Sequence, residues 1–136
     1  MSARKSSVTT DTAPLEAGAI VWVDLRPSLG REQGGVRPAI VLSNKAFHRL
    51  NQTAIVCPIT SNVKPWPTKV LLPAGLPVAG AVLTDQVRCL DRAARGFRQV
   101  GSVPDEVLLA IRLKLAELVG IAADEPPTMP PAQEPT

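Results

Sequence analysis

The residue best placed for chemistry in this chain is Arg37, which follows two consecutive glycines and precedes Pro38. The glycines allow backbone conformations that a Cβ would forbid, and the proline ring biases Arg37 toward extended geometry. A planar guanidinium held in this way is suited to binding two oxygens of a phosphate. Glu32 and Gln33 lie just before it. From the residues alone, Arg37 either binds a phosphate or forms a surface ion pair with Asp24 or Glu32.

A second polar segment, which follows Thr60, has the composition of a surface that contacts single-stranded nucleic acid. Trp66 stands between two prolines and could stack on an unpaired base, while Lys64 and Lys69 contact phosphates. Asn62 could read the edge of a base. The alternative is that Trp66 packs against the body of the protein and pins a long loop.

Charge is spread unevenly along the 136 residues, which are enough for one domain. The net charge of the whole chain is +3. The first fifteen residues carry +1 and the last fifteen −3, so residues 16–121 carry +5. A basic body suits a polyanionic partner.

The remaining reactive residue types are few. A single histidine and two separate cysteines do not have metal-ligand spacing, so we expect no metal or cofactor. Cys57 and Cys89 lie in apolar runs and are expected to be buried free thiols, whereas His48 is expected in a surface loop. No secretory signal or membrane-length apolar run is visible, which favours a cytoplasmic location.

The elements that must position these residues are mostly strands. Short runs rich in Val and Ile, separated by Gly, Pro, Asn and Asp, predict strands at 19–25, 38–43, 53–60, 68–72, 80–85, 86–90 and 97–101. The pattern then changes to helical spacing from Pro104 to Val119, with Val107, Leu108, Ile111, Leu115 and Leu118 on one face. Pro58, inside an apolar run, predicts a bulge or a sheet edge.

Both ends of the chain read differently from its middle. Residues 1–14 are polar and aperiodic and are expected to form a disordered arm, and the proline-rich residues 122–136 a disordered tail. The sequence therefore predicts one folded domain over residues 15–121, mainly β with a C-terminal helix.

Several of these runs together resemble one family. Residues 18–43, with the Gly-Gly-Val-Arg-Pro sequence, Thr84-Asp85-Gln86-Val87-Arg88, Arg95-Gly96 and residues 101–106 are similar to the MazF/PemK toxins of bacterial toxin–antitoxin pairs. The resemblance implies a small SH3-like barrel of the MazF/PemK/CcdB toxin type and a homodimer. It also implies sequence-specific, metal-independent cleavage of single-stranded RNA and inhibition by a cognate antitoxin protein.

The resemblance also implies roles for individual residues. In this family the ribose 2′-hydroxyl attacks the adjacent phosphate and leaves 2′,3′-cyclic phosphate and 5′-hydroxyl ends. Arg37 matches the catalytic arginine, and we expect it to stabilise charge on the phosphate, because its pKa makes it a reluctant proton donor. Thr60 matches the catalytic threonine, and Glu32 a proposed general base. The expected RNA contacts are Gln33, Asn62, Lys64, Trp66, Lys69 and Arg88.

Two other functions fit the same fold. Gyrase-poisoning toxins share it but act by binding a protein, and an inactive relative could bind RNA without cutting it. The set of Glu32, Arg37 and Thr60 favours the nuclease, because a gyrase binder has no need of it. Asp85 and Gln86 are expected to satisfy buried backbone groups rather than to do chemistry.

Overall fold

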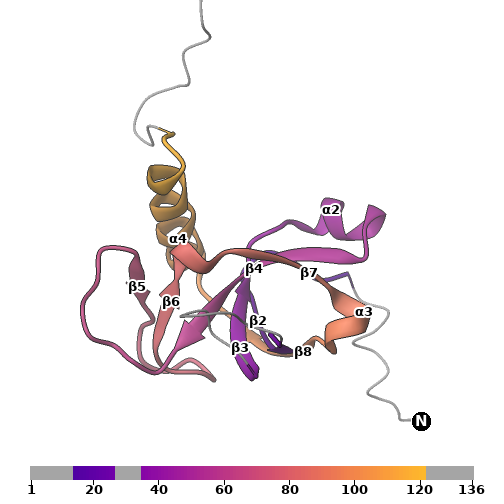
Figure 1. Cartoon of the computed structure of the whole chain (residues 1–136), viewed down its shortest axis with the longest axis horizontal. Coiled ribbons are helices and arrows are strands. Elements are labelled where there is room, and N and C mark those ends of the chain that lie inside the picture. Colours follow the sequence, from indigo (N-terminus) through magenta and orange to yellow (C-terminus); the bar gives the residue numbers. More distant parts are fainter. Residues whose placement is uncertain (1–13, 27–34, 122–136) are drawn as a thin grey trace, which may run out of the picture.

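The structure is a computed structural model in which residues 14–26 and 35–121 are described. Within these ranges seven strands form one antiparallel sheet in the order β5-β6-β4-β3-β2-β8, and β7 also pairs with β4 (Figure 1). The strands are β2 (Ala19–Asp24), β3 (Val36–Val41), β4 (Thr53–Thr60), β5 (Lys69–Leu71), β6 (Ala81–Leu83), β7 (Arg88–Asp91) and β8 (Arg98–Ser102). The helices are α2 (Lys45–Leu50), the 3₁₀ turn η1 (Thr84–Gln86), α3 (Arg92–Arg95) and α4 (Asp105–Leu118).

The mainly β architecture with a C-terminal helix is confirmed. All the predicted strands are present, with ends that differ by up to two residues from those expected. Among the described residues the order of the sheet runs from β5 to β8 without closing into a barrel. The expected N-terminal arm and C-terminal tail, except Pro14, lie outside the described residues, as do Glu32 and Gln33.

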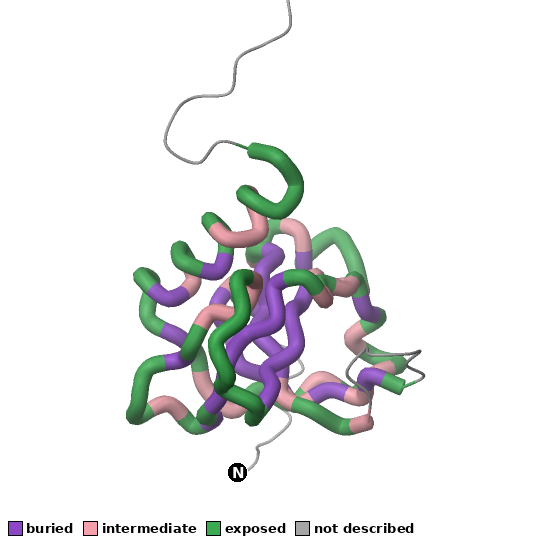
Figure 2. The backbone as a smooth tube through the Cα atoms, turned by 60° about the vertical axis from the view of Figure 1, so that its left-hand side comes forward, coloured by how far each residue is buried: buried purple, intermediate pink, exposed green. Residues whose placement is uncertain are grey.

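The strong curvature lets the sheet bury both of its faces. Alternate residues of a strand point to opposite sides, so Ile40 joins one apolar cluster while Ala39 and Val41 join another. The first cluster includes Val107 and Ile111 of α4, which stands at the β5–β6 side of the sheet, and the second includes Leu90 of β7 (Figure 1). Figure 2 shows the buried strands enclosed by exposed segments.

β4 is the central strand, so Pro58 does not lie on an outer edge of the sheet. On one side β4 pairs with β3, and on the other it pairs with β7 along Thr53–Val56 and with β6 at Ile59 and Thr60. Pro58 falls where the second partner changes from β7 to β6. A residue without an N–H is tolerated there because that side of the ladder is interrupted.

Helix α4 confirms the predicted change of period. Asp105 and Glu106 occupy its first turn, where carboxylates complement the positive helix end. Val107 and Ile111 are buried and Leu115 is half-buried against the same core, as predicted. Leu118, expected on the same face, is exposed because it lies in the last turn, beyond the edge of the sheet.

His48 corrects the prediction of a surface loop: it is buried and lies in α2. Its Nδ1 is 2.6 Å from the carbonyl oxygen of Leu15 and its Nε2 2.6 Å from Ser43 Oγ. A carbonyl only accepts, so Nδ1 donates to Leu15. Ser43 Oγ also accepts from the N–H of Ile55, at 2.9 Å. The imidazole therefore joins the N-terminal segment, α2 and the β3–β4 connection.

The two cysteines differ in their surroundings. Both are free, and Cys57 is buried as predicted, but Cys89 is exposed because it lies on the face of β7 opposite to that of the buried Leu90. Among the described residues, no helix is long and apolar enough to span a bilayer.

Candidate active site

Arg37 is presented at the start of β3, where the chain enters the sheet. Gly35 has a φ of 77°, which favours glycine, and its carbonyl accepts from the N–H of Leu25 at 2.9 Å. Arg37 then pairs in register with Val23 of β2, and it is exposed. Gly35 and Pro38 thus flank an exposed arginine at a strand end, as the sequence predicts; Gly34 lies outside the described residues.

Thr60 ends the neighbouring strand at the same end of the sheet. The β3–β4 ladder pairs Ala39 with Pro58. Arg37 lies two residues before Ala39, and Thr60 lies two residues after Pro58. Because strands alternate faces with a period of two and neighbouring strands are about 4.8 Å apart, this register brings Arg37 and Thr60 to one corner of the molecule.

The hydroxyl of Thr60 is held by its own loop. The side chain is 7% exposed, and its Oγ1 accepts from the N–H of Asn62 at 3.1 Å. A hydroxyl that accepts one bond still has its own proton to donate. Gly80 packs directly against the Thr60 backbone: a Cβ at this position would lie 2.2 Å from the Thr60 carbonyl oxygen.

A groove of about 440 Å³ opens beside Thr60. It is lined by Thr60, Asn62, Lys64, Pro65, Trp66, Thr68, Lys69, Leu83, Asp85 and Gln86. Most of the predicted RNA contacts therefore share one cavity. Asp85 and Gln86 were not expected there; η1 brings them in, and no local sequence pattern indicated this. Of the predicted residues within the described ranges, Arg37 and Arg88 do not line it.

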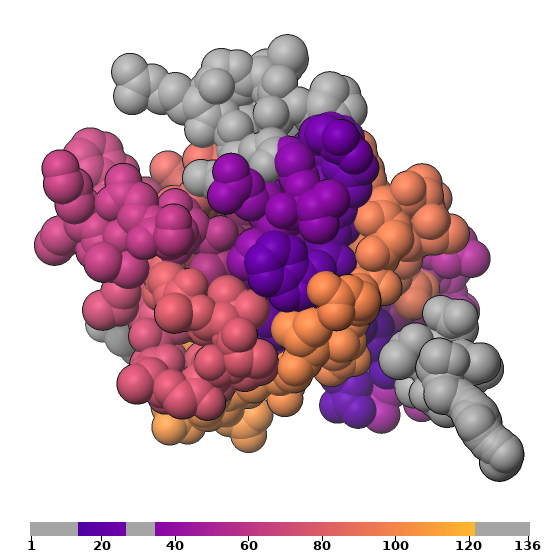
Figure 3. Space-filling model, turned by 90° about the horizontal axis from the view of Figure 1, so that it is seen from below, coloured from indigo at the N-terminus to yellow at the C-terminus, as the bar shows by residue number. Residues whose placement is uncertain are grey.

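The loop between β4 and β5 forms the outer wall of this groove. Seen from below, its magenta atoms lie on the same face of the molecule as the purple atoms of β3 (Figure 3). Trp66 is 63% exposed, so it does not pack into the body of the protein as the alternative interpretation required. The ammonium group of Lys69 donates to the carbonyls of Asn62, at 2.8 Å, and Lys64, at 3.1 Å.

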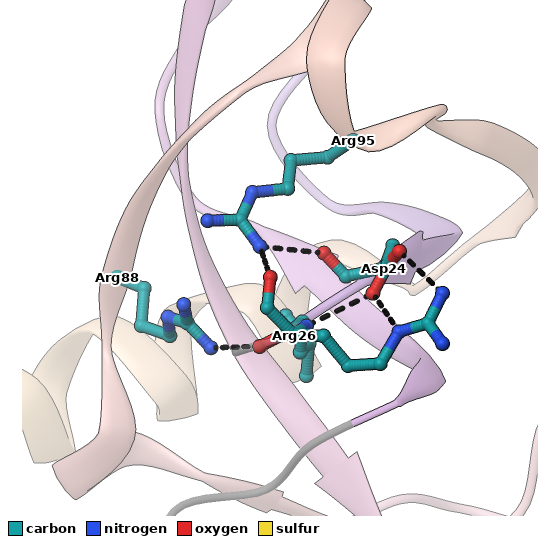
Figure 4. Close-up of polar contacts among 5 residues, drawn as sticks. Asp24, Arg26, Arg88 and Arg95 are labelled. Carbon is teal, nitrogen blue, oxygen red and sulfur yellow. Dashed lines mark hydrogen bonds and ion pairs between the residues drawn. The ribbon is translucent and has the colours of Figure 1, made fainter. Parts of the chain in front are cut away.

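Three arginines bind the end of β2 (Figure 4). Arg88 Nη1 donates to the carbonyl of Leu25 at 2.9 Å, and Arg95 Nη1 donates to the carbonyls of Asp24 and Arg26. Arg26 forms a two-point ion pair with Asp24, with Nε–Oδ1 at 3.0 Å and Nη2–Oδ2 at 2.9 Å.

These contacts hold the end of β2, the strand whose Val23 pairs with Arg37. The hydrogen bonds from Arg26 hold the pKa of the Asp24 carboxyl well below its usual range, so Asp24 is charged at neutral pH. Sequence reasoning missed this use of Arg95, because the carbonyls that it binds are some seventy residues away. It also missed the ion pair of Arg26 with Asp24, although the two residues are close in the sequence. Arg88 uses one of its N–H groups in the hydrogen bond to Leu25, and its contact with RNA stays a prediction.

No metal centre is evident in residues 14–26 and 35–121, where no three His, Cys, Asp or Glu side chains are grouped to hold an ion. Lys64 and Lys69 line the groove together with Thr60, and the β3–β4 register brings Arg37 to the same corner. Such a corner can hold an anion by its oxygens and present a hydroxyl to it.

Comparisons with known proteins agree with this geometry. The family described as "PemK-like, MazF-like toxin of type II toxin-antitoxin system" matches residues 16–119. The endoribonuclease toxin MazF of Escherichia coli (strain K12) is 36% identical over 105 residues, which cover 77% of this chain and 94% of that protein. Endoribonuclease EndoA of Bacillus subtilis (strain 168) is 36% identical over 83 residues, 57% of this chain and 72% of that protein.

Solved structures lead to the same family. MazF (Form-I) from Deinococcus radiodurans has a TM-score of 0.76 and 42% sequence identity, over 80% of this chain and 99% of that chain. The MazE-MazF (Form-II) structure from the same organism has a TM-score of 0.72 and 42% identity, over 81% of this chain and 99% of that chain. A match that spans nearly the whole described chain, both in sequence and in fold, establishes membership. The chain belongs to the PemK-like, MazF-like toxins of type II toxin–antitoxin systems.

Proposed function

We propose that this chain is an endoribonuclease toxin that cleaves single-stranded messenger RNA in the cytoplasm, with Arg37 and Thr60 acting on one phosphodiester. The observation that supports this most strongly is the β3–β4 register, which brings a guanidinium and a hydroxyl from neighbouring strands to one corner beside a groove. Its relatives are named endoribonucleases, and a gyrase binder has no use for this pair.

The proposed chemistry needs no external nucleophile. The ribose 2′-oxygen forms a bond to the adjacent phosphorus, the bond to the 5′-oxygen breaks, and the products are a 2′,3′-cyclic phosphate and a 5′-hydroxyl. Negative charge grows on the non-bridging oxygens, where the Arg37 guanidinium binds it. The Thr60 hydroxyl donates to the same phosphate. Glu32 takes the 2′-hydroxyl proton in this scheme and releases it to water, and water supplies the proton that the leaving 5′-oxygen takes up.

The groove accounts for binding beside the cut. Trp66 offers an exposed ring for base stacking, Asn62 offers polar groups for a base edge, and Lys64 offers positive charge to the backbone. Gln33 and Arg88 are proposed to extend this contact. Sequence preference then arises on the loop side of the site and phosphate binding on the β3 side.

A cognate antitoxin is the second partner. Solved structures similar to this chain include MazE-MazF structures from Deinococcus radiodurans and a mycobacterial endoribonuclease in complex with its cognate antitoxin. We propose that an acidic antitoxin segment covers the same basic corner as RNA, because one surface attracts either polyanion. The proposed active form is a homodimer.

Substitution of Arg37 tests the mechanism. Arg37→Ala removes the charge that binds the developing oxyanion, so the cleavage rate of a fluorogenic RNA in EDTA should fall by about 10²–10³-fold or more. Circular dichroism should show an unchanged fold, because Arg37 is exposed. Arg37→Lys keeps the charge but loses the two-point geometry and should recover only part of the rate.

The controls separate the competing functions. Intact RNA that the wild-type protein still binds would indicate an inactive RNA-binding relative, and inhibition of gyrase without cleavage would indicate the protein-binding toxin. Full activity in Arg37→Ala would remove this side chain from the mechanism. Mapping the ends of the cut RNA gives both the end chemistry and the site preference.

A further inference from the structure

The β4–β5 loop is held in shape by bonds from its own residues. The N–H of Asn62 donates to Thr60 Oγ1, and the N–H of Lys64 donates to Asn62 Oδ1 at 3.0 Å. At the other end, the N–H of Lys69 donates to the carbonyl of Trp66 at 3.0 Å. These bonds fix the two ends of the loop, but none of them joins one end to the other.

The side chain of Lys69 makes that connection. From the first residue of β5 its ammonium group reaches back to the carbonyls of Asn62 and Lys64, at 2.8 and 3.1 Å. An ammonium has three donors, and two of them are used here. Bonds from a charged donor are stronger than neutral ones. Lys69 therefore closes the loop across its base, with Trp66 between the joined ends.

We propose that Lys69 is a positioning residue: it holds the loop so that Trp66 is presented to a base, instead of binding a phosphate itself. The inference rests on the proposed RNA-cleaving function. An exposed aromatic ring at 63% exposure has little packing to fix its direction, so the loop backbone must do so. A loop that is already ordered before RNA binds does not lose conformational entropy on binding. Its fixed shape also favours the base that fits beside Trp66.

The test compares two lysines of the same loop. Lys69→Met keeps the length of the side chain and removes its donors. Lys64→Met removes a charge from the loop but leaves the bonds from Lys69 in place. Lys69→Arg keeps donors for the carbonyls. All are made in a Trp22→Phe background. Of the chain's two tryptophans, only Trp66 then remains.

The first measurement uses the protein without RNA. Time-resolved fluorescence anisotropy of Trp66 should show greater local motion in Lys69→Met, no change in Lys64→Met, and partial restoration in Lys69→Arg. Unchanged Trp66 motion in Lys69→Met would overturn the proposal. This result does not depend on cleavage, so it stands apart from any failure of the proposed function.

The second measurement uses RNA. In Lys69→Met, KM for the preferred sequence should rise and discrimination against single-base variants should fall by about three- to tenfold, the cost of ordering a side chain or two, with kcat nearly unchanged. The dependence of log affinity on log salt should keep its slope. A direct phosphate contact would instead lower the slope by about 0.7 when lost from a single strand, and that result would overturn the proposal.

Discussion

At the scale of single residues, the proposed site depends on the space left at Gly80. This residue has a φ of 138°, and a Cβ there would lie 2.2 Å from the carbonyl oxygen of Thr60 and 3.2 Å from the side chain of Ile59. Backbone, unlike a flexible side chain, cannot move aside without moving the residue it belongs to. Gly80 therefore controls where Thr60 sits relative to Arg37.

Gly80→Ala should displace Thr60 and lower kcat by about 10- to 100-fold, since shifts near 1 Å at a catalytic group have effects of that size. Gly75→Ala is the matched control. It also has a positive φ, 92°, but its Cβ would meet no atom within 4 Å. Both variants should lose about 1–3 kcal/mol of unfolding free energy from backbone strain. If both cleave RNA at the wild-type rate, Thr60 is not held by this contact.

Some of these residue-scale features could be predicted from sequence and others could not. Glycines before an arginine and a proline after it are local signals, and they predicted the backbone at Arg37. The burial of His48 and the reach of Lys69 across the loop depend on partners brought together by folding. Leu15, which accepts from His48, is more than thirty residues away. No pattern of neighbours along the chain encodes such a contact.

At the scale of elements, the positions of two thiols in β4 and β7 give them opposite environments. Cys57 lies in the central strand and is fully buried, whereas Cys89 lies on β7 opposite Ile55 and is exposed. Burial, with a smaller effect from the charge of Asp85, raises the pKa of the Cys57 thiol to about 12. The thiolate, which is the reactive form, is therefore suppressed at Cys57 by its place in the sheet.

Thiol reactivity should reveal this arrangement. At pH 8 the folded protein should react rapidly with Ellman's reagent at one thiol, and in denaturant at both. Cys89→Ser should abolish the fast phase, and Cys57→Ser should leave it intact. A fast phase of two thiols in the folded protein would mean that β4 opens readily or that Cys57 is not enclosed.

The longer elements could be predicted because their hydrophobic pattern extends over enough residues to be recognised. Strand β4 and helix α4 show sustained apolar runs or a helical period, and both were predicted. Helices α2 and α3 span six and four residues, too short for a period to appear. Arg92 instead helps to hold α2 in place, because its guanidinium donates to the carbonyls of His48, Asn51 and Gln52 at the end of that helix.

At the scale of the whole molecule, the described fold is complete in its own packing. Taken together, the two apolar clusters and the side chains packed against them extend from Leu15 to Leu115, and the backbone bonds that end α4 involve residues up to Ile121. The family match also ends at residue 119. We therefore expect the core to fold without the acidic, proline-rich segment that follows.

Deletion of residues 122–136 should leave Tm within about 2 °C of the full chain, less than a loss of 1 kcal/mol would cause in a domain of this size. Scanning calorimetry on both proteins measures this. Truncation at residue 115 is the opposing control, because it removes the last turn of α4 and should lower Tm clearly. A marked loss on removing 122–136 alone would show that this segment packs on the domain.

The pairing of β2 with β8 has a consequence for how the chain is made. β2 is the first strand of the described chain, yet Val21 pairs with Gln99 and Ala19 with Ser102 of β8. Contacts so distant along the sequence form slowly and leave a strand edge unpaired until they do. During synthesis, β2 emerges from the ribosome long before β8, one of its two neighbours in the sheet, has been translated. The message that encodes this toxin must thus be read through the codons of β8 before a finished sheet can exist.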